Sequence, residues 1–520
     1  MNPALSRRAL LTGAAGGAAL LALAGCTSAV GAQNSGTAKK GGTFLGGIST
    51  DLVPANFFTN SNAGVTTIIG LVYESLIHYP VDRLRPEPRL AKDWTISPDG
   101  RTVTLHLRDD VTFHTGRPFT SADVAFSLRT YADPKWNGQL KSTAQAITSI
   151  DARDPHTAVL HLAHPLGNIL DLLEIVPIVD EKTFAGVGDG SRYVGTGPFV
   201  FEKWSPNSRL KFAKNPKYWV PGRPYLDAVD IAVITDTTSL TSQLRSGQID
   251  YAYGSSFLDI ERLEKSGKFD TIQLRGAETQ VYVGTNVTAE GLADVRVRQA
   301  IAHALDRDRV IAEVFRGSGY TANLPWPKTS PAYDAQLNAS YGRDVAKAKS
   351  LLAAYGKPVP TLKYSYIAKD PLLAATAQIV QANLKEIGIT VALDPLDPPT
   401  FVAQLIGGKF PGLWTAYHSW AQYTPSTLTV SAYPFNALKN SSHYTSAAYT
   451  RDADAAWRQV AGDSVEARKA YTALSRDLLD GLFLIEIGVI EGRWAVSDRV
   501  RNVAYTKRSE LVLTDAQLTA

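Results

Sequence analysis

The sequence predicts a mixed α/β protein, because patterns typical of strands and of helices alternate along most of the chain. Hydrophobic residues make up 44% of the chain, with nine tryptophans and 22 tyrosines, as expected of a well-packed globular protein. Its 520 residues allow two or three domains. Cys26 is the only cysteine, so no disulfide within the chain can hold the fold, and stability must come from core burial.

The N-terminus has the pattern of an export signal, which we assign to residues 1–25. Arg7 and Arg8 precede an apolar run that is shorter than the roughly 18–20 residues a bilayer-crossing helix needs. The run ends in Leu-Ala-Gly-Cys, which is similar to a bacterial lipobox, where the thiol is acylated and the chain is cut just before it. This resemblance implies that Cys26 carries a lipid such as palmitate. Residues 26–40 are small and polar, which predicts a flexible tether.

One alternative and one overlapping signal stay open for this segment. In the alternative, Cys26 ends an ordinary signal and is removed with it. The overlapping signal is Ser-Arg-Arg-Ala-Leu-Leu, which resembles a twin-arginine motif, so the chain would cross the membrane folded rather than by the Sec route. No later stretch is apolar enough to span a membrane.

The charge balance argues against a nucleic-acid binder. The formal net charge is +4, and removal of Arg7 and Arg8 with the signal leaves +2. A nucleic-acid-binding surface needs a concentrated basic face, and this composition does not indicate one.

Local patterns place the elements of the first part of the chain. A strand begins at residues 43–45, and residues 65–76 are apolar at helical spacing. Residues 94–96 and 102–107 flank the turn Ser-Pro-Asp-Gly, which predicts a hairpin. The string Thr-Ser-Ala-Asp at 120–123 predicts the start of a helix.

Two more helices are predicted further along the chain. The first begins at Asp294, and its apolar face is formed by Val297, Ile301, Ala304 and Leu305. The second is amphipathic, covers residues 371–387, is closed by Gly388 and leads into a strand at 389–393.

Several ordered blocks carry a family resemblance. They are Glu-Pro-Arg-Leu-Ala-Lys-Asp-Trp at 87–94, Leu-Arg-Asp-Asp-Val-Thr-Phe-His-Thr-Gly at 107–116, Gly-Thr-Gly-Pro-Phe at 195–199, Asn-Pro-Lys-Tyr-Trp at 215–219 and Asp-Val-Arg-Val-Arg-Gln-Ala at 294–300. Together they are similar to the extracellular solute-binding proteins of family 5, the peptide, nickel and oligosaccharide receptors of ABC importers. In the last block, Arg296 and Arg298 are expected to make structural ion pairs rather than to touch a ligand.

The resemblance implies a class II periplasmic-binding-protein fold, with two lobes, an additional domain and a ligand cleft between the lobes. By analogy, lobe I (domain I) comprises 41–77, 194–285 and 488–520, the additional domain II comprises 78–193, and lobe II (domain III) comprises 286–487.

The resemblance also implies a binding protein rather than an enzyme, with no catalytic residue, no cofactor and no resident metal. Its partners would be a small ligand, an ABC permease with its ATPase subunits, and the membrane through the N-terminal lipid. We expect a monomer on the outer face of the cytoplasmic membrane, in the periplasm or at the cell surface.

One departure from the family pattern bears on the ligand. Peptide-binding members resemble Gly-Trp-x-x-Asp-x-x-Asp-Pro, in which an Asp holds the α-ammonium group of the peptide. The corresponding segment here, 417–425, contains Trp420 but no acid, and no Asp or Glu occurs between Asp397 and Asp452. Because an unpaired buried ammonium costs several kcal/mol, ordinary dipeptides are expected to bind poorly.

The same segment supplies the candidate ligand-binding residues. Their aromatic faces and neutral polar groups suit a modified peptide, an opine-like or amide-rich compound, or an oligosaccharide. The residues are Trp414, Tyr417, His418, Trp420, Gln422 and Tyr423.

Three alternative functions are carried forward. A metal-chelate receptor of the nickel type would use His418, although a single His is a weak metal signal. A surface-anchored hydrolase has little support, because Ser208 fits only a Ser-x-x-Lys string and its partner motifs are missing. A surface adhesion or signalling protein that has lost transport is the third.

Overall fold

The computed structural model describes residues 38–59, 62–136, 138–419, 423–459 and 462–519. They lie in one compact unit, Ser35–Ala520. The predicted export signal and Cys26 lie outside the described residues. No helix in the described ranges is long and apolar enough to cross a membrane.

A seven-stranded sheet gathers strands from three distant parts of the chain. Its central strand β2 (Thr43–Ile48), expected from the sequence, pairs in parallel with both neighbours. In spatial order the strands are β13 (Phe269–Gln273), β20 (Arg493–Ser497), β12 (Tyr251–Tyr253), β2, β11 (Ala228–Val233), β10 (Arg209–Lys214) and β9 (Phe199–Ser205). Helices α1 (Ala63–Val72), α5 (Thr237–Arg245) and α6 (Phe257–Ser266) pack against its strands.

Helix α1 ends four residues earlier than its apolar pattern predicts. Tyr73 has extended backbone angles, and the chain continues from it through residues 74–76 to strand β3 (Ile77–His78). This turn carries Glu74 into a buried polar cluster, which a continued helix would not do.

A four-stranded antiparallel sheet confirms the predicted hairpin. The strands are ordered β5 (Ala91–Ile96), β6 (Thr102–Leu107), β8 (Thr157–Leu162) and β7 (Ile147–Asp151). Helix α2 (Ser121–Ala132) begins where predicted, because the Asp123 carboxylate accepts a hydrogen bond from the Thr120 amide at 2.9 Å and closes a capping box. Helices α3 (Lys141–Gln145) and α4 (Ile169–Ile175) follow.

A six-stranded sheet forms the core of the second half of the chain. In spatial order its strands are β15 (Gly319–Thr321), β19 (Leu484–Ile490), β14 (Thr279–Thr285), β18 (Leu413–His418), β16 (Leu362–Ile367) and β17 (Val391–Leu396). Its helices are α7 (Val295–Ala304), α8 (Arg307–Arg309), α9 (Val345–Tyr355), α10 (Pro371–Glu386), α11 (Pro398–Gly407), α12 (Pro425–Ser431), α13 (Ala447–Trp457) and α14 (Val465–Gly481).

Both helices predicted in this half are confirmed. Asp294 caps α7 by accepting a hydrogen bond from the Arg296 amide at 2.9 Å, and Arg296 also pairs with its carboxylate at 2.6 Å. Arg298 differs from the expectation that it makes a structural ion pair. Its buried guanidinium donates to backbone oxygens, including Gly481 O at 2.8 Å, because the carbonyls left over at the end of α14 need donors.

The remaining strands are short. They form the sets β1 (Ala38–Lys39), β24 (Gln517–Thr519) and β21 (Val500–Arg501); β22 (Ala504–Tyr505) and β23 (Leu511–Val512); and β3 with β4 (Glu87–Pro88). The pairing of β1 with β24 means that the predicted tether already has fixed backbone partners at residues 38–39.

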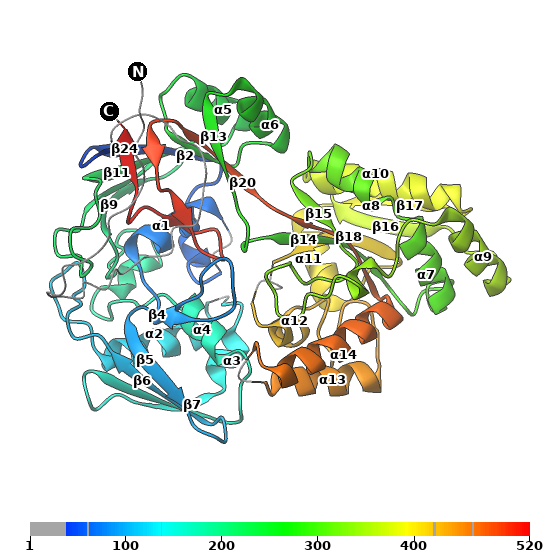
Figure 1. Ribbon diagram of the computed structural model, residues 1–520, viewed down its shortest axis with the longest axis horizontal. Coiled ribbons are helices and arrows are strands. Elements are labelled where there is room, and N and C mark those ends of the chain that lie inside the picture. The colour runs from blue at the N-terminus through cyan, green and yellow to red at the C-terminus, as the bar shows by residue number, and fades with distance from the viewer. Residues whose placement is uncertain (1–37, 60–61, 137, 420–422, 460–461, 520) are drawn as a thin grey trace, which may run out of the picture. The chain divides into compact units, whose positions relative to one another are not determined.

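The chain passes between the seven- and six-stranded sheets twice (Figure 1). One connection joins β13 to β14 through residues 274–278, and the other joins β19 to β20 through residues 491–492. Gln273 is the last residue of β13, just before the first connection, and Glu491 is the first residue of the second connection. Their side chains are hydrogen-bonded to each other. By hydrogen bonding, β14 belongs to the six-stranded sheet, whereas its residues fall within the predicted lobe I. The domain limits stay a prediction.

Candidate functional site

The predicted binding segment begins on strand β18, whose side chains alternate between two faces of the six-stranded sheet. Trp414 and His418 share one face with each other, and Tyr417 points to the opposite face. Residues next to each other in a strand cannot line the same surface, so the segment divides its candidates between two environments.

Trp414 lies in the hydrophobic core. Its side chain is fully buried, and its ring stacks on Phe410 at a centroid distance of 4.7 Å and an interplanar angle of 15°. Gly284 on β14 makes room for the indole, since a Cβ there would lie 2.1 Å from it. This environment favours a structural role for Trp414.

Tyr417 lies on the other face of β18 and is half-buried. Its hydroxyl is 3.5 Å from the Asp370 carboxylate, which caps α10 by accepting the Leu372 and Leu373 amides. Burial, together with the neighbouring Asp370 charge, raises the pKa of Tyr417 well above its usual value. Tyr417 therefore contacts the start of α10 rather than His418.

His418 is buried among polar side chains from three strands. Its Nε2 lies 3.2 Å from Glu486 Oε1 on β19, and its ring packs edge-on against Phe435 at 4.7 Å. Gln280 on β14 is its direct cross-strand partner. This cluster lies at the end of the sheet next to both connections, because β14 begins at Thr279 and β19 ends at Ile490.

Four polar atoms of this cluster are buried without a hydrogen-bond partner in the described parts of the chain. They are both side-chain polar atoms of Gln280, Nδ1 of His418 and Oε2 of Glu486. Buried polar groups are normally paired, so these atoms point to a hydrogen-bonding partner of another molecule, such as water or a solute.

Glu486 is a residue that the sequence reasoning missed. It lies 68 positions from His418 and outside the acid-free segment. A single Glu within the otherwise apolar strand Leu-Ile-Glu-Ile-Gly-Val-Ile was the available signal, because a charge is rarely buried without a purpose.

Tyr423 lies at the far end of the segment, where it contacts a different part of the molecule. Its side chain is fully buried, and its ring meets Tyr79 edge-on at a centroid distance of 6.3 Å. The next residue, Thr424, donates to the Asp171 carboxylate of α4 through its hydroxyl at 3.0 Å. His418 and Thr424 therefore lie in different surroundings: His418 belongs to the six-stranded sheet, whereas Thr424 contacts α4.

The six predicted ligand-binding residues are therefore not gathered at one surface. His418 lies in the polar cluster, Trp414 in the core, Tyr417 against α10 and Tyr423 against Tyr79. Trp420 and Gln422 lie outside the described residues. A role in ligand binding stays a prediction for each of them.

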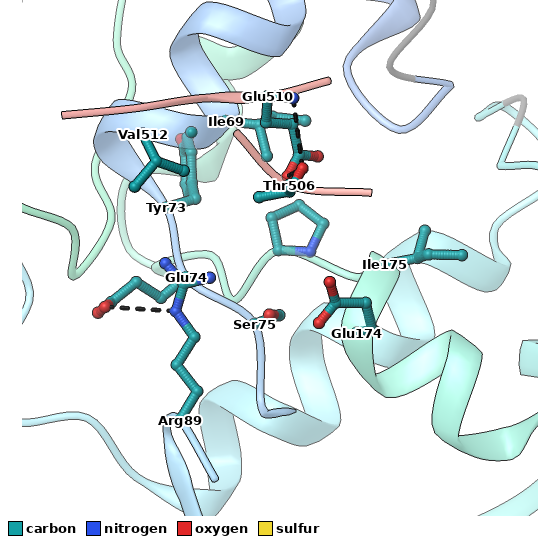
Figure 2. Close-up of a pocket in the computed structure, with 12 residues that line it drawn as sticks. Ile69, Tyr73, Glu74, Ser75, Arg89, Glu174, Ile175, Thr506, Glu510 and Val512 are labelled. Carbon is teal, nitrogen blue, oxygen red and sulfur yellow. Dashed lines mark hydrogen bonds and ion pairs between the residues drawn. The ribbon is translucent and has the colours of Figure 1, made fainter. Parts of the chain in front are cut away.

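A small cavity next to α4 is too small for a solute. Figure 2 shows the acidic side chains Glu74, Glu174 and Glu510 around it, with Arg89 paired to Glu74. Its volume of about 20 Å³ holds roughly one water molecule. We assign it to the packing of the polar interior.

No group of three or more His, Cys, Asp or Glu side chains in the described ranges is placed to hold a metal ion. His418 has one acidic neighbour, Glu486, which makes two potential ligands. Coordination by protein side chains alone would need more than this pair supplies.

Comparison with known proteins places this geometry in context. A family model described as "Bacterial extracellular solute-binding proteins, family 5 Middle" matches residues 85–439. A Brucella ovis protein assigned to the ABC transporter peptide-binding class is 30% identical over 69% of this chain and 70% of its own length. The oligopeptide-binding protein AppA of Bacillus subtilis is 26% identical over 74% of this chain and 78% of its own.

Solved structures share the fold. The binding protein AgaA from Agrobacterium tumefaciens R10, in complex with agropinic acid, has a TM-score of 0.77 and 25% identity, covering 92% of this chain and 99% of that one.

Proposed function

The chain belongs to the bacterial extracellular solute-binding proteins of family 5, and from this we propose that it captures one small solute between two lobes and delivers it to an ABC permease. The family and the similar proteins are receptors, and structures of the same fold have two lobes. The match over residues 85–439 is the observation that carries the receptor role. Chemistry on the solute is no part of the proposal, since ATP hydrolysis would be performed by the partner subunits.

The double passage of the chain between its two large sheets supports capture by closure. In the part of the chain that the structure describes, the short connections 274–278 and 491–492 are the only ones that link these sheets. Such paired connections allow lobes to rotate about a hinge. A solute that contacts both lobes binds the closed form better and shifts the population toward it.

For the ligand, we favour a compound recognised through neutral hydrogen bonds and aromatic contacts. Residues 398–451 contain no Asp or Glu, so this part of the chain offers no partner for an α-ammonium group. The amide of Gln280 and the imidazole Nδ1 of His418 have no hydrogen-bond partner among the described residues and suit hydroxyl and amide groups, while Glu486, the acid of this cluster, already pairs with His418 through Oε1. An opine-like or modified amino-acid derivative, an amide-rich compound or an oligosaccharide has this chemistry, and AgaA is bound to agropinic acid.

Native mass spectrometry of freshly purified protein tests the receptor role and the ligand class together. We expect a retained compound whose mass and fragments indicate a polar molecule without a free α-ammonium group. A protein that retains nothing, and that gains no mass from any fraction of culture medium, would contradict the proposal. A retained nickel chelate would favour the metal-chelate receptor instead.

We propose that Cys26 anchors the receptor to the membrane. Replacement of Cys26 by Ser is expected to release the protein from the membrane fraction, because a Ser hydroxyl does not accept the thioether-linked lipid. Ligand retention should be unchanged, since the candidate binding residues belong to the unit Ser35–Ala520, which does not include Cys26. Cell fractionation with immunoblotting measures release, with Ser35→Ala as the control that stays anchored; a membrane-bound Cys26→Ser protein would contradict lipid anchoring.

A further inference from the structure

Asp171 on α4 is a buried carboxylate whose hydrogen-bond donors come largely from the other half of the molecule. It is 0% exposed and accepts the Thr424 amide at 3.2 Å, the Thr424 hydroxyl at 3.0 Å and the Thr427 hydroxyl at 2.8 Å. The Tyr79 hydroxyl also donates to it. Three of these four bonds reach α4 from the segment that follows β18.

The backbones of the two sides also approach each other closely next to Asp171. At Gly167, just before α4, an added Cβ would lie 2.1 Å from the Trp457 carbonyl oxygen at the end of α13. The neighbouring edge contact between Tyr79 and Tyr423 buries both rings. These contacts require the α4 side and the α12–α13 side to be together, so a motion that separates the two sides would break them.

The charges around Asp171 give this contact a pH dependence. Burial raises the pKa of Asp171 to about 6, against the hydrogen bonds from Thr427, Thr424 and Tyr79, which favour the carboxylate. The titratable and charged groups that face it are Glu174 on α4, Tyr79 before it, Lys507 from the C-terminal segment, and Tyr423 and Tyr471 from the opposite side. Burial also lowers the pKa of Lys507 to about 8, so most Lys507 side chains keep their charge between pH 5 and 7.

We propose that Asp171, Thr424 and Thr427 form a latch between the lobes that takes up a proton when it closes, so that closure and solute binding strengthen as the pH falls. The proposal rests on the closure motion of the proposed function. It adds that a residue outside the predicted binding segment sets the affinity, as a positioning residue that acts through closure rather than through contact with the solute.

The sign follows from the two environments of Asp171. In the closed form its pKa is about 6, whereas in an open form that exposes it to water the ordinary value of about 4 applies. The closed form therefore binds the proton more tightly, and the ratio of closed to open molecules should rise about tenfold between pH 7 and pH 5. The protonated acid can keep its contacts, because a Thr hydroxyl both donates and accepts hydrogen bonds.

The distance between two spin labels, measured without solute by electron–electron resonance, tests the latch. The labels are placed at Ser149→Cys on β7 and Val465→Cys at the start of α14, both at exposed positions, in the Cys26→Ser background. The short-distance population should grow relative to the long-distance population by about tenfold from pH 7 to pH 5. Asp171→Asn should remove this response, because an amide does not titrate, and Asp109→Asn at an exposed site of the same domain should keep it.

A double variant keeps the test decisive if the closed form predominates at every pH. Thr424→Val with Thr427→Val removes two hydroxyl donors and leaves Asp171 in place, so the long-distance population should increase at pH 7 and the response to acid should remain.

Two results would overturn the latch: an Asp171→Asn protein that retains the wild-type response, or a closed population that falls with acid. Neither depends on solute, so the proposed receptor role would stand on its own mass-spectrometric test.

Discussion

Replacement of Glu74 by Ala is expected to lower the free energy of unfolding by about 3–5 kcal/mol, because it breaks a buried ion pair by removing one partner. The Glu74 side chain is fully buried and lies 3.5 Å from the Arg89 guanidinium. It accepts hydrogen bonds from the Thr196 hydroxyl at 2.8 Å, the Tyr218 hydroxyl at 2.9 Å and the Trp219 indole at 2.8 Å. Alanine would remove the acceptor of one buried donor, Thr196, and of two part-buried donors, Tyr218 and Trp219.

Urea unfolding followed by tryptophan fluorescence measures this loss, analysed for the first cooperative transition because a protein of several domains need not unfold in two states. Glu74→Gln, which keeps one acceptor oxygen, should cost about 1–3 kcal/mol. Glu290→Ala, at an exposed site in the other half of the chain, should stay within about 0.5 kcal/mol of wild type. A Glu74→Ala protein as stable as the Glu290→Ala control would show that the cluster contributes nothing to stability.

An acid introduced into the acid-free segment at position 422 is expected to create affinity for ordinary dipeptides, which we expect the natural chain to bind poorly. The carboxylate of Gln422→Asp would pair with the α-ammonium group, and a hydrogen bond to a charged group is worth about 1.5–3 kcal/mol, or roughly a tenfold to hundredfold gain in affinity. Isothermal titration calorimetry with Ala-Phe measures the gain.

Two controls separate charge from shape in this experiment. Gln422→Asn has nearly the same shape as the Asp variant and should give no gain, and N-acetylated Ala-Phe should bind neither variant. Micromolar binding of Ala-Phe to the natural protein would contradict the account of the missing acid. Loss of that binding in Glu486→Gln would then identify Glu486 as the replacement anchor.

The elements that the sequence predicts correctly depend on local chemistry. The hairpin of β5 and β6 needs only its turn, and α7 and α10 are marked by Asp294 and Asp370 at their starts. The role of Arg298 was predicted only in part, because its carbonyl partner on Gly481 lies 183 positions away.

The site was harder to predict, since it is made by long-range contacts. Nothing local in the segment around His418 indicates that Glu486 comes from another strand to meet it, or that Thr424 meets Asp171, which lies 253 positions earlier. Strand alternation also separated Tyr417 from His418, and the sequence alone did not fix the ends of that strand. The absence of an acid over residues 398–451 could be read from the composition alone, because it does not depend on the fold.

The polar cluster and the proposed latch contain residues that are close in the sequence, His418 and Thr424. His418 lies in the polar cluster with Glu486, and Thr424 donates a hydrogen bond to Asp171. A solute that binds at His418 and Glu486 in the closed form would therefore favour the latch, and a protonated Asp171 would favour the form that receives the solute.

Small-angle X-ray scattering of the protein with and without its solute tests capture by closure most directly. The retained compound would be removed by partial unfolding and dialysis, then added back after its identification by mass spectrometry. The account predicts a larger radius of gyration for the stripped protein and a return to the compact value at one equivalent of solute. An identical radius of gyration in the stripped and reloaded states, with the solute demonstrably bound, would contradict it.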